Sequence, residues 1–415
     1  MPDTLLLHHI GELCTLEGGP RRGKEAMSDL GIMTDAAVLI EDGVIEEVGP
    51  SEKLLREAPT GAGKVHCGGR AVVPGFVDAH THAVFAGDRV DELALKLAGA
   101  TYQEILASGG GILRTVRLTR EASRAELLKS LLSRLSSMME YGTTTVEVKS
   151  GYGLDLETEK RLLEVCRVAD ERHPMDVVPT FLGAHAVPPE FSDAHEYARH
   201  VAEKMVPEVG DLAEFVDVFC EQGVFDPDDS RLVLEAGAQE GMRVKVHADE
   251  LARSGGSLLA AELGAVSADH LLHAGAQERK ALADADVACV LLPATALSLA
   301  APYANARALI DADALVALGT DCNPNCYTMS MPFVMSLACH GMRMTPSEAL
   351  CAATVNAAAA VGRDDRGTIE EGQLADLVIL DAPSHRYLPY QFGMNPVWRV
   401  LKLGEVVVDW SNRRR

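Results

Sequence analysis

The sequence predicts an α/β fold in which a (β/α)8 TIM-type barrel carries a small β-sandwich domain. Short apolar runs rich in β-branched residues alternate with amphipathic stretches along residues 69–365, and eight such units suggest a closed parallel barrel. Residues 1–68 and 366–415 instead contain short strands joined by turn signals. The expected organisation is therefore a barrel of residues 69–365 inserted into a β domain that both ends of the chain build together.

The barrel strands are expected where a short apolar run precedes a helical stretch. The eight runs are residues 71–80, 143–150, 176–185, 214–220, 243–250, 265–273, 287–293 and 315–324. Between them lie segments such as "RAELLKSLLSRLSSMMEYG" and "LETEKRLLEVCRVADER", whose apolar residues recur near the helical period. Near-continuous apolar strands that alternate with helices are typical of a parallel sheet covered by helices. In barrels of this type the chemistry lies at the carboxyl ends of the strands.

The two chain ends carry hairpin patterns. "DAAVLIEDGVIEEVG" contains two short strands around an Asp-Gly turn, and "GQLADLVILDAP" and "WRVLKLGEVVVDW" contain further strands, the latter with a turn at Gly-Glu. One shared β domain is the expected arrangement. Two separate small sheets are an alternative that periodicity alone leaves open.

Composition and charge limit the classes of partner. The chain has 415 residues, 47% of them hydrophobic, and a formal net charge of −23. Such a surface repels nucleic acid and anionic membranes, and no run approaches the roughly 18 apolar residues of a membrane helix. The N-terminus lacks the pattern of a signal peptide, and the nine cysteines form no regular framework. We therefore expect a cytoplasmic protein that binds neither nucleic acid nor membrane.

Five chemically active side chains follow the ends of predicted barrel strands. His80 and His82 stand two residues apart after the first strand, which places both on one face of an extended chain. His247 follows the fifth strand, His270 the sixth and Asp321 the eighth. Imidazoles with a carboxylate suit Zn²⁺ or iron and leave a position open for water. The remaining histidines have no comparable context and are interpreted as structural: His8, His9, His66, His173, His195, His200, His273, His340 and His385.

These residues stand in motifs that resemble the amidohydrolase superfamily of metal-dependent barrel hydrolases. "HTHAVFAGDR", "EVKSGYGL", "FLGAHAVP", "VHADE" and "GTDCNPN" are most similar to the branch whose members open 4-imidazolone-5-propanoate to N-formimidoyl-L-glutamate. The resemblance assigns His80, His82, His247 and Asp321 to one zinc or iron ion per chain. It also implies a homodimer.

The resemblance and general chemistry together suggest catalytic roles. A bound cation makes hydroxide available near pH 7, and Asp321 can carry the proton from water to the leaving ring nitrogen. Glu250, three residues after His247, is expected to act as a general acid or base or to contact the ring nitrogen. His270 is expected to polarise the carbonyl under attack.

The substrate implied by the resemblance also carries a carboxylate, which an acidic chain must hold with specific donors. Arg89 can bind a carboxylate through two hydrogen bonds, and Tyr152 and His185 match substrate contacts of the family. Asn323 and Asn325 can add amide donors. Many relatives have glycine and a small hydroxyl residue where this chain has Asn325 and Cys326, which leaves the completion of this carboxylate clamp open.

Other activities are compatible with part of this pattern. A metal-dependent ring deaminase would use the same ligands, with Glu250 protonating a ring nitrogen, but a neutral nucleobase has no need of Arg89. A non-catalytic barrel scaffold would have gaps in the ligand set, and none is visible. Some superfamily members bridge two metals with a carbamylated lysine, yet the ligands above complete a mononuclear site, so Lys149 is expected to be unmodified.

Overall fold

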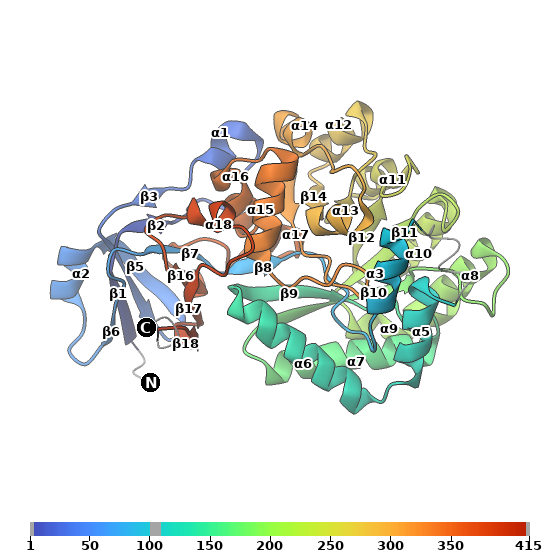
Figure 1. Ribbon diagram of the computed structural model, residues 1–415, viewed down its shortest axis with the longest axis horizontal. Coiled ribbons are helices and arrows are strands. Elements are labelled where there is room, and N and C mark those ends of the chain that lie inside the picture. The colour runs from blue at the N-terminus through green and yellow to red at the C-terminus, as the bar shows by residue number, and fades with distance from the viewer. Residues whose placement is uncertain (1–3, 100–108, 412–415) are drawn as a thin grey trace.

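The computed structural model describes residues 4–99 and 109–411, and its centre is an eight-stranded parallel barrel (Figure 1). The strands follow one another in chain order around the sheet, each parallel to the next. They are β8 (Phe76–Asp78), β9 (Thr143–Lys149), β10 (Asp176–Ala184), β11 (Phe215–Cys220), β12 (Arg243–Ala248), β13 (Ser267–His270), β14 (Ala288–Leu291) and β15 (Leu315–Leu318). The fold class is confirmed, and each predicted run contains one barrel strand, although the first run is divided between two sheets.

The barrel closes between its first and last strands through the segments that follow them. The backbone N–H of Asp321 donates to the carbonyl of His80 at 2.9 Å, and the N–H of His82 donates to the carbonyl of Cys322 at 3.0 Å. A parallel bridge between Thr81 and Cys322 joins the same two segments. Closure thus brings two sets of predicted ligands, far apart in the sequence, side by side.

Helices surround the barrel, and the two amphipathic stretches singled out in the sequence form α6 (Arg124–Glu140) and α7 (Leu156–Arg172). Helix α6 begins with a capping box, in which Ser123 and Glu126 satisfy each other's backbone N–H groups. The other helices are α1 (Gly23–Ser28), α2 (Ser51–Glu57), α3 (Val90–Leu97), α5 (Gly111–Glu121), α8 (Ala194–His200), α9 (Val206–Val209), α10 (Pro227–Gln239), α11 (Gly256–Leu263), α12 (Ala276–Asp284), α13 (Pro293–Leu299), α14 (Ala306–Asp311), α15 (Met331–Met342), α16 (Pro346–Ala352), α17 (Val355–Ala360) and α18 (Tyr387–Tyr390), with a π-helical turn at Val201–Met205 and a 3₁₀ turn at Gly210–Leu212. Among residues 4–99 and 109–411, no helix is both long enough and apolar enough to cross a membrane.

The two ends of the chain form a pair of sheets beside the barrel (Figure 1). One has the order β5-β4-β1-β6, made of β1 (Thr4–Ile10), β4 (Ala36–Glu41), β5 (Val44–Pro50) and β6 (Gly63–His66). The other has the order β18-β17-β16-β7-β2-β3, made of β2 (Glu12–Cys14), β3 (Ile32–Met33), β7 (Ala71–Pro74), β16 (Leu377–Leu380), β17 (Val397–Lys402) and β18 (Glu405–Asp409). A shared apolar core that includes Leu7, Val38, Leu377 and Leu401 packs between the sheets. The ends therefore form one sandwich rather than two separate sheets.

The first apolar run differs from its prediction as a single strand. Residues 71–74 form β7 in the terminal sandwich, and the chain then crosses at Gly75 into β8 of the barrel. Pro74 has no N–H to continue a ladder. A Cβ on Gly75 would lie 2.3 Å from the Thr144 hydroxyl, so only glycine fits this crossing. The single-strand prediction is wrong here, and the domain boundary placed at residue 69 stays a prediction.

Candidate active site

The structure brings the four predicted metal ligands together at the carboxyl end of the barrel. All four side chains are buried. Asp321 Oδ1 lies 3.5 Å from His82 Nε2 and 3.7 Å from His80 Nε2. The Nε2 atoms of His82 and His247 face each other at 3.3 Å. Two nitrogens bound to one tetrahedral zinc ion lie about 3.3 Å apart, so the spacing of His82 and His247 suits a shared cation. His80 belongs both to a group with His82 and Asp321 and to a group with His247 and His270.

Two buried carboxylates orient these imidazoles from behind. Asp269 Oδ2 lies 2.6 Å from His80 Nδ1, and Asp217 Oδ2 lies 2.9 Å from His247 Nδ1. Each carboxylate favours the tautomer that carries its proton on Nδ1, which leaves Nε2 as the acceptor. His80 Nε2 is buried and has no hydrogen-bond partner within residues 4–99 and 109–411. An unpartnered acceptor aimed at neighbouring ligands is what a metal site requires.

A buried lysine balances the charge of these carboxylates. Lys149 Nζ lies 2.7 Å from Glu147, 2.8 Å from Asp217 and 3.6 Å from Asp269. Burial lowers the pKa of Lys149, but the three carboxylates more than reverse this effect and hold its pKa above the ordinary value. The ammonium form of Lys149 is therefore favoured. The sequence analysis considered Lys149 only as a bridging ligand and missed Glu147, Asp217 and Asp269 altogether. The sequence feature that could have revealed them is an acidic residue within an otherwise apolar predicted strand.

Asp321 occupies a constrained position after β15. Its backbone has a positive φ of 50°, and its carboxylate accepts hydrogen bonds from the Thr295 hydroxyl at 2.5 Å and from Asn323 Nδ2 at 2.9 Å. Burial raises the pKa of Asp321 to about 6. Asn323 also accepts the backbone N–H groups of Asn325 and Cys326. Both polar atoms of its amide thus hold the loop, whereas the side-chain oxygen of Asn325 accepts a hydrogen bond from Lys96.

Glu250 and His270 lie together beside the ligand cluster. His270 Nδ1 is 3.6 Å from Glu250 Oε1, and the His270 ring centroid is 5.2 Å from that of His247. Burial, with a smaller contribution from the Asp321 carboxylate, raises the pKa of Glu250 to about 8. A carboxyl group with this pKa is mostly protonated at pH 7. His270 also presents a ring nitrogen within 4.8 Å of ring nitrogens of His80 and His247, close enough to join their group.

Two further predicted residues, His185 and Tyr152, border the cluster, whereas Arg89 pairs with an acidic side chain. The His185 ring stacks on His82 at 4.9 Å, and the Tyr152 ring lies 5.3 Å from His185. Burial, with His247 nearby, lowers the pKa of His185 to about 3, so this imidazole stays neutral at physiological pH. Arg89 Nε donates to the buried Glu92 carboxylate at 2.8 Å. Arg89 is therefore positioned by an acidic neighbour that the sequence analysis did not consider.

Comparison with known proteins identifies the family. A model of the amidohydrolase family matches residues 71–409. The imidazolonepropionase of Symbiobacterium thermophilum is 51% identical over 423 aligned residues, covering 100% of this chain and 99% of the relative. That of Haloarcula marismortui is 56% identical over 378 residues, covering 90% of each. The chain belongs to the imidazolonepropionases of the amidohydrolase family. The family resemblance inferred from the motifs is thus confirmed, and the chain is a hydrolase.

Solved structures agree in fold. A zinc-bound adenosine deaminase from Xanthomonas campestris superposes with a TM-score of 0.72 at 22% identity, covering 98% of this chain and 93% of that one. Guanine deaminase from E. coli gives a TM-score of 0.72 at 17% identity, covering 98% and 99%. At this identity the likeness shows the barrel fold alone. The family and the histidine-rich cluster together indicate a metal-binding site.

Proposed function

We propose that the protein hydrolyses the cyclic amide of 4-imidazolone-5-propanoate to N-formimidoyl-L-glutamate, a step of histidine degradation. The observation that carries this function is about 50% identity to imidazolonepropionases along the whole chain. The buried ligand cluster at the barrel mouth supports it, because water must be activated to open an amide near neutral pH. The relatives described above at about 50% identity are imidazolonepropionases and not ring deaminases, so the deaminase alternative is not favoured.

His80, His82, His247 and Asp321 are the residues proposed to hold one zinc or iron ion. When bound, such an ion lowers the pKa of water and so supplies hydroxide at neutral pH. The three imidazoles and the carboxylate suit either metal. The carboxylates behind His80 and His247 support this assignment, since metal-binding histidines usually donate their second N–H to such a group.

Asp321 is proposed to move the proton during hydrolysis. Its carboxylate accepts the proton of the attacking water and later delivers it to the ring nitrogen that leaves the cleaved amide. The hydrogen bonds from Thr295 and Asn323 hold the carboxylate in one orientation for both transfers. Asn323 thus serves as a positioning residue in this proposal rather than as a substrate donor.

Glu250 and His270 are proposed to act on the substrate ring. Glu250 is mostly protonated at pH 7 and can donate a hydrogen bond or a proton to a ring nitrogen. Burial and the imidazole of His247 lower the pKa of His270 well below its ordinary value. Neutral His270 can donate a hydrogen bond to the carbonyl oxygen as negative charge develops there.

Arg89, Tyr152, His185 and Asn325 are proposed to bind the propanoate arm and the ring. The guanidinium of Arg89 uses Nε on Glu92, and its two terminal nitrogens are the donors suited to a substrate carboxylate. We further expect the protein to form a homodimer and to be located in the cytoplasm. Neither expectation depends on the proposed reaction.

The direct test supplies the protein with one equivalent of metal and with imidazolonepropionate made freshly from urocanate by urocanase. Loss of the imidazolone absorbance and appearance of formimidoylglutamate are followed together, with Asp321→Ala as the inactive control. Metal-dependent turnover that disappears in the variant is expected. Substrate loss no faster than spontaneous decay, with metal bound stoichiometrically, would contradict the proposed function.

A further inference from the structure

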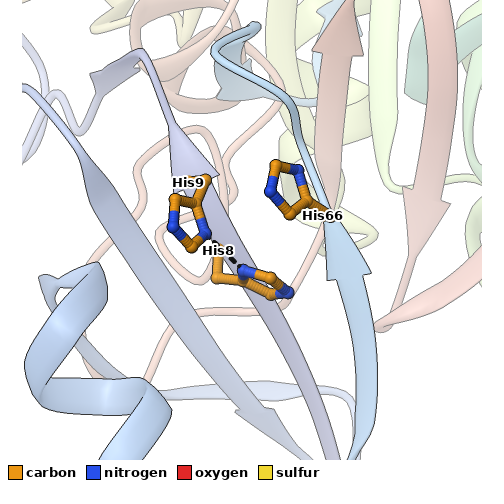
Figure 2. Close-up of side chains that lie close together, drawn as sticks. All are labelled: His8, His9 and His66. Carbon is orange, nitrogen blue, oxygen red and sulfur yellow. Dashed lines mark hydrogen bonds between the residues drawn. The ribbon is translucent and has the colours of Figure 1, made fainter.

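Three histidines of the terminal sandwich meet, although no motif in the sequence groups them. His8 and His9 are consecutive in β1, and His66 ends the neighbouring strand β6 (Figure 2). Consecutive residues of a regular strand point to opposite faces. Here the pairing of β1 with β4 shifts register between Leu7 and Ile10, and His9 adopts a positive φ of 55°. This bulge turns His9 towards the side on which His8 lies.

The register between β1 and β6 supplies the third imidazole. His8 and His66 are direct partners in this parallel pair, and β6 is the edge strand of its sheet. The rings of His9 and His66 stack at 4.6 Å with an angle of 5° between their planes, and His8 approaches both edge-on at 4.9 Å. His8 is buried, whereas His9 and His66 are exposed, so the group is open to solvent on one side.

The nitrogen atoms of the three rings converge. His8 Nδ1 and His9 Nδ1 are 2.6 Å apart (Figure 2). One nitrogen from each of the three rings lies within 4.8 Å of the other two. His66 Nδ1 accepts the backbone N–H of Gly68 at 3.0 Å, which leaves its Nε2 as the nitrogen with a free lone pair or proton. The backbone around the group is also fixed, because the N–H of His9 donates to the Ser51 hydroxyl at 2.9 Å.

We propose that His8, His9 and His66 form a second metal site, which binds a divalent ion of the zinc class outside the barrel. Three imidazoles match the nitrogen preference of Zn²⁺, and the exposed side leaves room for water as a fourth ligand. Nitrogens around a tetrahedral ion lie about 3.3 Å apart, so small rotations of exposed side chains are enough to reach this spacing. A non-glycine residue at positive φ is strained, and the proposed site gives the bulge at His9 a function.

Bound metal would tie the edge strand β6 to β1 through side chains. The site shares no residue with the barrel cluster and belongs to a different sheet. Its occupancy is therefore separable from hydrolysis, and the inference does not depend on the proposed function.

The test counts metal ions in variants that leave the barrel cluster intact. Zn²⁺ is titrated by calorimetry into the full chain whose barrel site already holds one equivalent, and bound metal is measured after gel filtration. His66→Gln removes one imidazole at an exposed edge. His9→Asn removes another with a residue that tolerates a positive φ. His340→Ala is the matched control, because His340 is an exposed histidine outside all three-residue ligand groups of the described chain.

A second equivalent of Zn²⁺ is expected in the wild type and in His340→Ala. Its affinity should fall about tenfold or more in each of the other variants. In the wild type, Zn²⁺ should also protect His9 and His66 from diethyl pyrocarbonate, as mapped by mass spectrometry. A wild type that binds one equivalent only, or a second equivalent that persists unchanged in both variants without protection of these histidines, would overturn the proposal.

Discussion

The buried charges beneath the candidate active site predict that two buried lysines contribute unequally to the free energy of unfolding. Lys149 in β9 and Lys245 in β12 both lie inside the barrel with their side chains fully buried. Lys149 contacts three carboxylates, whereas Lys245 donates to the backbone carbonyls of Ala79 and Ala360, at 3.4 and 3.1 Å, and lies 5.4 Å from the centre of the Phe215 ring. Replacing each by methionine keeps the volume similar and removes one charge.

The two substitutions should differ in cost. Lys149→Met leaves buried carboxylates without their counter-charge, and breaking such a pair typically costs about 3–5 kcal/mol of unfolding free energy. Burial lowers the pKa of Lys245, so its charged form is less favoured in the fold than in the unfolded chain. Lys245→Met loses two hydrogen bonds to carbonyls, worth about 1 kcal/mol each, and removes the cost of burying a charge. The expected cost of Lys245→Met is therefore near zero to about 2 kcal/mol.

Urea denaturation followed by fluorescence and circular dichroism, at equal metal saturation, provides the comparison. Intact mass of the wild type should show Lys149 without a carboxyl adduct. Equal destabilisation by the two substitutions, or a smaller effect at Lys149, would refute the reasoning. Such a result would mean that Glu147, Asp217 and Asp269 share protons and do not need the ammonium group.

Three further substitutions test the site. Asp269→Asn should weaken metal binding about 10–100-fold, measured by chelator competition, because the amide that faces His80 Nδ1 no longer carries the negative charge that favours its tautomer and basicity. Turnover by the wild type should fall as pH rises through roughly 8, where Glu250 loses its proton, and this limb should disappear in Glu250→Gln. If the limb persists in that variant, another group is responsible for it. Arg89→Ala should raise KM for the anionic substrate about 10–100-fold with a smaller change in kcat, and an unchanged KM would remove Arg89 from the clamp.

Much of the barrel could be predicted because its signals are local. Each parallel strand is buried on both faces, so each appears as an apolar run, and the ligands appear as histidines or aspartate just beyond these runs. The crossing at Gly75 could not be predicted in this way. Residues 71–74 and 76–78 are equally apolar, and only the approach of Thr144 from another strand shows where the chain leaves one sheet for the other.

The partners of the ligands are harder to predict than the ligands. Asp217 and Asp269 are single acidic residues in apolar strands, and their roles depend on which side chains the closed barrel places opposite them. Asn323 was expected to face the substrate, yet its amide is used on Asp321 and on the loop backbone. His8 and His9 were interpreted as structural because they had no context comparable to that of the barrel ligands. Strand alternation would also separate two neighbouring side chains, and only the structure shows the bulge at His9 that brings them together.

The two histidine clusters should differ in how firmly they hold metal, for a reason visible behind the rings. In the barrel, buried carboxylates face the Nδ1 atoms of His80 and His247, which fixes both tautomers and increases the basicity of the ligating nitrogens. In the sandwich, the only described support of His66 Nδ1 is a donated backbone N–H, and two of the three rings are exposed. A chelator added in steps should therefore remove the sandwich metal first while turnover persists. If activity instead falls as the first equivalent of metal is removed, the barrel metal is the weaker one, and buried carboxylates do not set the order of affinity.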